Sequence, residues 1–250
     1  MVNAIGLGAI AGLIPVYVGI LAALFLGKVL PRTWESGLIG VANGVLVYLF
    51  FDLMHEATEQ TGARDPVSWL VFLGSLGISF VGLVALESRQ VFGGRAGNRV
   101  LSLPYMIAVG MGLHNLGEGL AIGTSYASGE YTLSLLLVAG FGLHNGTEGF
   151  GIVGAAGKTP ISWRDVILLG LIAGLPTCVG TFLSGQGVSS YFSICFYALA
   201  AGSLLYVILA LTVMSYTATR RVQVATGLFA GISLMYLTAM VLTLVSGVRS

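Results

Sequence analysis

Two short polar motifs, thirty residues apart, hold two of the three histidines in this chain. They read GMGLHNLGEG over 110–119 and GFGLHNGTEG over 140–149, and seven of the ten aligned positions are identical. The polar residues align as three pairs: His114 with His144, Asn115 with Asn145, and Glu118 with Glu148. On an α-helix each His and Glu lie one turn apart on one face. Two opposed faces would surround one point with two imidazoles and two carboxylates, which suits a divalent metal ion.

The composition of the chain predicts an integral membrane protein. Only 8% of the 250 residues are charged and 56% are hydrophobic, whereas soluble proteins average about 25% charged residues. Most of the chain falls into apolar stretches long enough to cross a hydrocarbon core of about 30 Å. No cluster of basic residues suggests nucleic-acid binding. We therefore predict an all-α, multi-pass protein of the cell membrane, either a plasma membrane or a bacterial or archaeal inner membrane.

The apolar stretches predict eight transmembrane helices in one transmembrane domain that covers residues 1–250. The predicted spans are about 5–27, 37–57, 67–86, 103–126, 131–155, 163–184, 190–215 and 221–247. Short connections join them, and no soluble domain is expected.

The distribution of Lys and Arg predicts the orientation of these spans. The loops after spans 1, 3, 5 and 7 hold nine basic residues: Lys28, Arg32, Arg89, Arg95, Arg99, Lys158, Arg164, Arg220 and Arg221. The opposite side holds Arg64 and Arg249. Because basic residues are enriched on the cytoplasmic side, these four loops are predicted to be cytoplasmic and both termini to lie outside.

A fainter repeat relates the two ends of the chain. Residues 42–48, ANGVLVY, resemble residues 200–206, AAGSLLY. Residues 12–19, GLIPVYVG, resemble residues 174–180, GLPTCVG, if one residue is inserted. Spans 1–3 and 6–8 then form two copies of a three-helix unit in a 3+2+3 inverted repeat, an arrangement common among secondary transporters. Chance similarity between helices rich in Gly, Leu and Ala is the alternative.

The motifs lie near the middle of the bilayer, which makes their charges costly. A charged residue there costs roughly 2.5–3.5 kcal/mol, so Glu118 and Glu148 together oppose insertion by about 5–7 kcal/mol. Such residues persist when they pair, line water or bind an ion. We predict metal ligation by His114, Glu118, His144 and Glu148. The alternative is a protonated carboxyl that is hydrogen-bonded to a neighbouring His or Asn.

A second polar group ends span 2. Asp52, His55, Glu56 and Glu59 share one face of the predicted helix. We interpret Asp52, His55 and Glu56 as an entrance or auxiliary site that attracts cations at the outer surface. An ordinary solvated helix end is the alternative, and for Glu59 we prefer it.

With these features the sequence resembles the ZIP (Zrt-, Irt-like) family of divalent metal transporters along its whole length. Residues 114–119 and 144–149 match the family's HNxPEG-type motifs, with Gly117 and Thr147 in place of proline. Residues 200–207 are similar to its AAGxMxYV segment, and residues 174–180 to its GLxEPLG stretch.

The chain also departs from the family pattern, as expected of a diverged, prokaryotic-type member. Thr177 stands where many relatives have a Glu that helps to hold a second metal. Ala210 and Leu211 stand where bacterial relatives often have acidic residues. Family members also often have a His-rich loop between spans 3 and 4, whereas the corresponding loop here, over 90–100, contains no His. The resemblance therefore implies one principal metal rather than a full binuclear site, and it leaves open whether these changes alter or abolish transport.

The resemblance implies inward transport of a divalent cation by an alternating-access, elevator-like mechanism. Spans 1, 4, 5 and 6 would move against spans 2, 3, 7 and 8, with the cation entering near Asp52 and Glu56. Asn115 and Asn145 would be weak carbonyl ligands or would orient the other ligands. Zinc is expected first, with iron, manganese, cobalt and cadmium as alternatives. Protons are expected to compete with the metal, and a homodimer is compatible with the sequence.

Two other functions stay open at this point. One is an intramembrane metal-dependent hydrolase, which would act without metal flux; against it, the sequence has no HExxH motif. The other is a metal-binding family member that has lost transport, which would bind tightly without flux. We predict a transporter rather than an enzyme.

Overall fold

The computed structural model describes residues 4–29, 32–62, 64–89, 101–157, 159–184, 189–217 and 219–246, and within them no β-strand occurs. The elements are α1 (Ala4–Gly8), η1 (Ala9–Leu13), α2 (Ile14–Val29), α3 (Arg32–Glu59), α4 (Pro66–Ser88), α5 (Ser102–Ala127), α6 (Tyr131–Ala155), α7 (Trp163–Ser184), α8 (Ser190–Ser215) and α9 (Arg221–Ser246). The π-helical turn η1 joins α1 and α2 into one continuous helix. The all-α prediction is confirmed. Arg95, Arg99, Lys158, Arg249 and the loop over 90–100 lie outside the described residues.

Each predicted span corresponds to one helix, with small differences at the ends. Helices α7 and α8 begin and end where the sequence predicts. The largest difference is in α3, which begins at Arg32 rather than near residue 37. Its first turn contains Glu35, and such polar residues fall outside an apolar window although they continue the helix.

Six of the described helices are long and apolar enough to cross a membrane, which identifies a multi-pass membrane protein. They are Ala4–Val29, Trp34–Glu59, Pro66–Ser88, Trp163–Ser184, Ser190–Ser215 and Arg221–Leu244. The two long helices that remain, α5 and α6, are those that carry the His/Asn/Glu motifs. Polar side chains lower the hydropathy of a helix, so apolarity alone does not establish all eight predicted spans.

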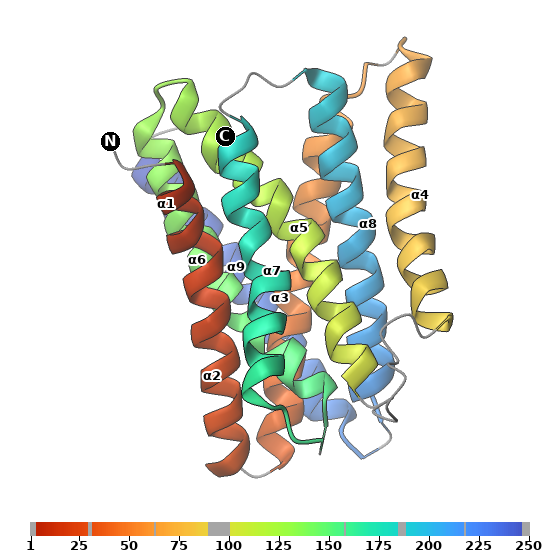
Figure 1. Cartoon of the computed structure of the whole chain (residues 1–250). Coiled ribbons are helices and arrows are strands. Elements are labelled where there is room, and N and C mark those ends of the chain that lie inside the picture. Colours follow the sequence, from red (N-terminus) through yellow and green to blue (C-terminus); the bar gives the residue numbers. More distant parts are fainter. Residues whose placement is uncertain are drawn as a thin grey trace.

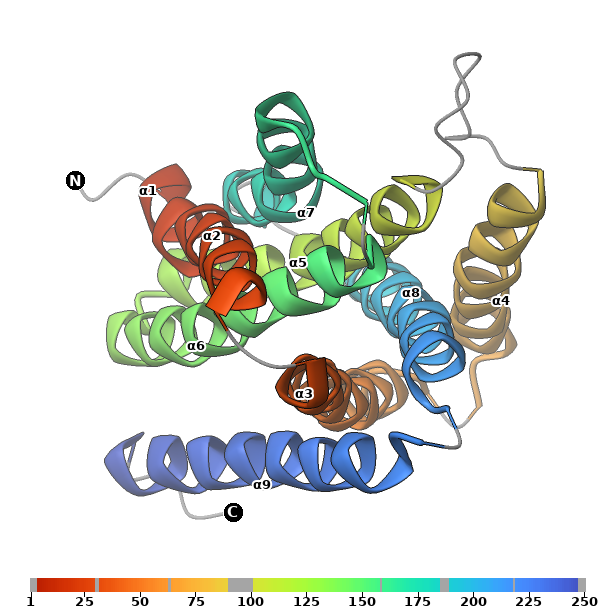
Figure 2. The same cartoon turned by 90° about the horizontal axis from the view of Figure 1, so that it is seen from below.

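The helices form two groups that meet along α5 and α6. In the view from below, α1–α2 and α7 lie on one side of α5 and α6, and α3, α4, α8 and α9 lie on the other (Figure 2). We call α1–α2, α5, α6 and α7 the bundle, and α3, α4, α8 and α9 the scaffold. The connections after α2, α6 and α8 lie at one end of the molecule (Figure 1), which we call the basic end because Lys28, Arg164, Arg220 and Arg221 flank it.

Helix pairing follows the order that an inverted repeat requires. Within the bundle α2 packs on α6 and α5 packs on α7, while within the scaffold α3 packs on α9 and α8 packs on α4. The predicted repeat relates α1–α2 to α7, α3 to α8, α4 to α9, and α5 to α6. Replacing each helix by its counterpart gives the same four pairs again. The pairing therefore agrees with the predicted three-helix repeat.

Glycines at equivalent positions of the repeat make equivalent contacts. A Cβ atom at Gly44 would overlap the Leu228 carbonyl of α9, and one at Gly202 would overlap the Leu76 carbonyl of α4. Gly44 and Gly202 align in the two heptapeptides of the repeat. Small residues of this kind allow helix backbones to approach closely inside a membrane, which explains the close approach of each scaffold pair at these glycines.

The bundle is joined by the same kind of contact. A Cβ at Gly149 of α6 would overlap the backbone of Gly19 and Ile20 in α2. On the other side, a Cβ at Gly119 of α5 would overlap the Thr177 carbonyl of α7 and approach Gly180. Both motif helices are thus in backbone contact with their bundle partners.

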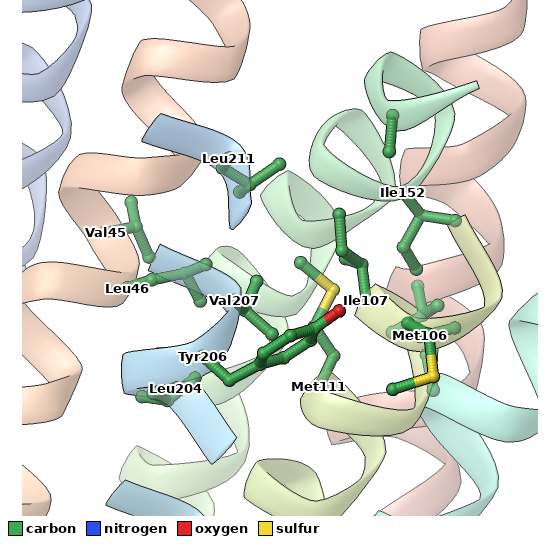
Figure 3. Close-up of a cluster of buried hydrophobic side chains, with 14 of the residues drawn as sticks. Val45, Leu46, Met106, Ile107, Met111, Ile152, Leu204, Tyr206, Val207 and Leu211 are labelled. Carbon is green, nitrogen blue, oxygen red and sulfur yellow. The ribbon is translucent and has the colours of Figure 1, made fainter. Parts of the chain in front are cut away.

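The boundary between bundle and scaffold is an apolar layer of interdigitated side chains (Figure 3). The labelled members of this layer, none more than 2% exposed, are Val45, Leu46, Met106, Ile107, Met111, Ile152, Leu204, Tyr206, Val207 and Leu211. They come from α3, α5, α6 and α8. On α5, Met111 of this layer lies three residues before His114, so the layer directly adjoins the polar motif.

Candidate metal centre

Helices α5 and α6 bring the two polar motifs together inside the bundle. The ring centroids of His114 and His144 are 6.0 Å apart, and both side chains are 1% exposed. Glu118 lies between them: its Oε1 is 3.0 Å from Nε2 of His114 and also contacts Nε2 of His144. One ligand atom from each of these three residues lies within 4.8 Å of the others. Two nitrogens and one carboxylate oxygen therefore converge on one point.

Glu148 flanks this point rather than sharing it. Its Oε1 is 3.9 Å from Nε2 of His114, and its Oε2 accepts a hydrogen bond of 3.0 Å from Nδ2 of Asn115. Of the four predicted ligands, three converge and the fourth lies beside one imidazole. The two glutamates consequently have different surroundings although their motifs match.

The two asparagines connect each motif to the other and to the outer helices of the bundle. Asn145 Nδ2 donates to Glu118 Oε2 at 2.9 Å and to the Ala11 carbonyl at 2.9 Å. Asn115 Nδ2 donates to Glu148 Oε2 and, at 3.0 Å, to the Ala173 carbonyl. Each amide nitrogen thus orients the carboxylate of the opposite motif, a role that a donor set around a metal ion requires.

Pro15 leaves the Ala11 carbonyl without its usual backbone donor, so that it can accept from a side chain. In an α-helix this carbonyl would accept from the amide of residue 15, which is Pro15 and has no N–H. Within η1 the amide of Ile14 instead reaches the carbonyl of Ala9, five residues back. A π turn accommodates one extra residue, and one residue must be inserted to align 12–19 with 174–180. This consequence was not predicted from the sequence, although Pro15 was its visible signal.

Several buried polar atoms of the centre have no hydrogen-bond partner. They are Nδ1 of His114 and His144, Oδ1 of Asn115 and Asn145, Oε1 of Glu148 and Oγ1 of Thr177. His114 Nε2 is close to Glu118 but is not aligned for a hydrogen bond. Buried polar atoms are nearly always paired in proteins. Nitrogen and oxygen donors in this state fit a divalent cation.

Two further residues border the centre. The ring of Phe141, three residues before His144, packs edge-on against that imidazole with centroids 5.5 Å apart. Sequence analysis missed Phe141, although its helical spacing from His144 was visible. Thr177 is fully buried, and its side chain occupies the space that a Cβ at Gly12 would need. Leu211 is fully buried and belongs to the apolar layer.

The structure does not bring the predicted entrance residues into the centre. Asp52, His55 and Glu56 are exposed near the end of α3. His55 Nε2 lies 3.3 Å from Glu59 Oε1. Asp52 and His55 line a pocket of about 370 Å³ together with Tyr48. Their position at a surface pocket is compatible with an entrance, which stays a prediction.

A larger cavity opens at the basic end, on the boundary between bundle and scaffold. It measures about 890 Å³, and its lining includes Lys28 of α2, Ile39 of α3, Gly154 of α6 and Ser215 of α8. These residues belong to both helix groups. In this conformation the boundary is therefore open toward the basic end.

Comparison with known proteins finds a partial similarity to a metal transporter. Over 131 residues, or 51% of this chain, the sequence is 33% identical to the human (Homo sapiens) protein named zinc transporter ZIP4. The aligned part is 20% of that relative, so the similarity spans about a fifth of its length. No protein-family model matches the sequence.

Proposed function

We propose that this protein carries divalent metal cations across a membrane and that it is a ZIP-like transporter. The observation that carries the proposal is the convergence of His114, Glu118 and His144 within 4.8 Å in the buried bundle. The partial similarity to human zinc transporter ZIP4 supports it. Zinc is the first expected substrate because imidazole nitrogens and carboxylate oxygens suit it, with iron, manganese, cobalt and cadmium as alternatives.

The residues of the centre have separable roles in this proposal. His114 and His144 supply neutral nitrogen ligands, and Glu118 and Glu148 supply two negative charges that offset those of the cation. This matters because an uncompensated charge is costly in a low-dielectric interior. Asn115 and Asn145 hold the carboxylates through their amide nitrogens, since those nitrogens donate to Glu148 and Glu118.

The two-group architecture supports an alternating-access, elevator-like movement. Backbone contacts at Gly149 and Gly119 join the motif helices to α2 and α7, so the bundle is suited to move as one body with its cation. The boundary with the scaffold is formed by side chains and opens at the basic end. Under the positive-inside rule that end is cytoplasmic, and the cation would leave toward the cytoplasm.

Metal uptake by proteoliposomes tests the proposal. The purified chain is reconstituted, and uptake of Zn²⁺, Fe²⁺, Mn²⁺, Co²⁺ and Cd²⁺ is followed against protein-free vesicles. We expect saturable uptake of zinc and of at least one other ion. Absence of uptake for every ion would contradict the proposal. Hydrolysis of lipid or peptide without flux would favour the hydrolase, and tight binding without flux would favour a member that has lost transport.

Eight spans with both termini outside predict that residues 130 and 159 lie on opposite sides of the membrane. Glu130 lies between α5 and α6. If those two helices cross the membrane, a cysteine at 130 will react with an impermeant thiol reagent from outside, while one at Thr159 will not. Labelling is done in a variant with Cys178 and Cys195 replaced by serine. Equal protection of both positions in intact cells would show that α5 and α6 do not span.

A further inference from the structure

A second buried polar pair lies on the scaffold, outside the His/Glu centre. Asn43 of α3 donates from Nδ2 to Thr212 Oγ1 of α8 at 2.8 Å. The Asn43 side chain is 1% exposed, and its Oδ1 has no hydrogen-bond partner. The hydrogen bond between α3 and α8 accounts for the burial of the amide nitrogen of Asn43. It does not account for the burial of the amide oxygen, which is removed from water and has no donor.

Contacts along α6 fix the level of this pair in the molecule. A Cβ at Gly151 would lie 3.1 Å from Met111 Cε and 3.3 Å from Leu211 Cδ1. One turn further along α6, a Cβ at Gly154 would lie 2.7 Å from Ile39 Cδ1. Ile39 and Gly154 line the cavity at the basic end. Met111 and Leu211 therefore close the space between that cavity and the part of α6 that carries the metal ligands.

Asn43, which is buried, and Thr212, which is half-buried, lie at the level of this closing layer along the helix axes. Asn43 is one helical turn from Ile39, on the side away from the cavity, and Thr212 directly follows Leu211. At 1.5 Å per residue, His144 and Gly151 are about 10 Å apart along α6. Along the helix axes, the polar pair thus lies at a level between the centre and the cavity, roughly one turn beyond the cavity lining.

We propose that Asn43 and Thr212 form a transit site for the divalent cation between the His/Glu centre and the cavity at the basic end. This inference rests on the proposed transport function. Their oxygens are the ligands on offer in a layer where Met111 and Leu211 present a thioether and an alkyl chain. Neutral amide and hydroxyl oxygens bind a divalent cation weakly, so the site would lower the barrier to passage without retaining the ion.

The transit role has a structural competitor, because the same hydrogen bond could serve only to tie α3 to α8. A purely structural tie predicts lower thermal stability and an unchanged transport rate per folded molecule. A transit site instead predicts a lower transport rate per folded molecule, because the metal binds normally at the centre but is released slowly. The two roles are therefore separable by measuring binding and flux on the same variants.

The test compares Asn43→Leu and Thr212→Val with the wild type. Saturating Zn²⁺ uptake is measured in proteoliposomes and Zn²⁺ affinity in detergent. We expect uptake to fall at least about fivefold, as loss of an oxygen ligand in an apolar layer implies, with affinity unchanged. Ser75→Ala is the matched control, because Ser75 Oγ donates to Cys195 Sγ at 3.3 Å and so joins scaffold helices away from this layer. Its uptake should equal that of the wild type.

A charge substitution at the same position sharpens the test. Asn43→Asp keeps the size of the side chain and adds a negative charge, which should hold the cation. We expect one additional Zn²⁺ bound per protein and slower uptake. Wild-type-like saturating uptake in both Asn43→Leu and Thr212→Val would overturn the transit site while leaving the transport proposal intact. A wild-type protein without uptake would instead overturn the transport proposal. If Asn43→Leu does not fold, the isosteric Thr212→Val still decides the matter.

Discussion

Replacing both Glu118 and Glu148 with alanine is expected to reduce metal uptake to the level of protein-free vesicles. The double variant leaves two neutral imidazoles to hold a doubly charged ion in a low-dielectric interior, where charge compensation is worth several kcal/mol. The Gln versions should fail equally, because they keep an oxygen acceptor for Asn115 and Asn145 but lose the charge. Uptake of Zn²⁺ into proteoliposomes is the measurement.

The single variants should differ in severity because the two glutamates differ in position. Glu118 contacts both imidazoles, whereas Glu148 approaches only His114, at 3.9 Å. We therefore expect Glu118→Gln to lower uptake more than Glu148→Gln. Glu130→Gln is the matched control, since Glu130 is exposed between α5 and α6. Uptake by the double variant within about twofold of the wild type would exclude the centre as the carrier site.

Placing valine at Gly149 is expected to destabilise the folded protein by about 3 kcal/mol or more, the upper end of the usual cost of overpacking. The added Cβ would overlap backbone atoms of Gly19 and Ile20, and backbone cannot move aside as a flexible side chain can. Gly119→Val should have a similar effect through the Thr177 carbonyl. The thermal unfolding midpoint in detergent measures both.

The control for these variants uses the same substitution in a glycine without such a neighbour. Nothing lies within 4 Å of a Cβ at Gly82 of α4, so Gly82→Val changes helix propensity in the same way but adds no overlap. Its midpoint should stay near that of the wild type. Equal midpoints for Gly149→Val and Gly82→Val would mean that α2 and α6 do not approach as closely as described.

Much of the centre could be predicted because its signal is local and repeated. The spacing of His114 and Glu118 places both on one helical face, and the same spacing recurs at His144 and Glu148. Charged side chains in apolar helices cost free energy unless they pair or bind an ion. Two matching polar faces were therefore expected to lie against each other. The bounds of the helices were predictable for the same reason, since they depend on local hydropathy.

Other features depend on contacts between distant segments and could not be predicted. The spacing in the motif gives Asn145 no preferred partner, and its bond to the Ala11 carbonyl arises only because Pro15 removes the usual donor from a helix far away in the sequence. The displacement of Glu148 from the three converging ligands has no counterpart in its motif. The pairing of Asn43 with Thr212 likewise joins residues 169 positions apart.

The contact between Gly19 and Gly149 also limits how this protein can change over evolutionary time. A Cβ at Gly19 would overlap the Gly146 carbonyl, and a Cβ at Gly149 would overlap the backbone of Gly19 and Ile20. Neither position can therefore gain a methyl group unless the partner helix shifts as well. Single substitutions are blocked there, whereas the lipid-facing sides of the same helices can vary freely. Sequence drift should therefore spare these contact lines even where transported ions differ.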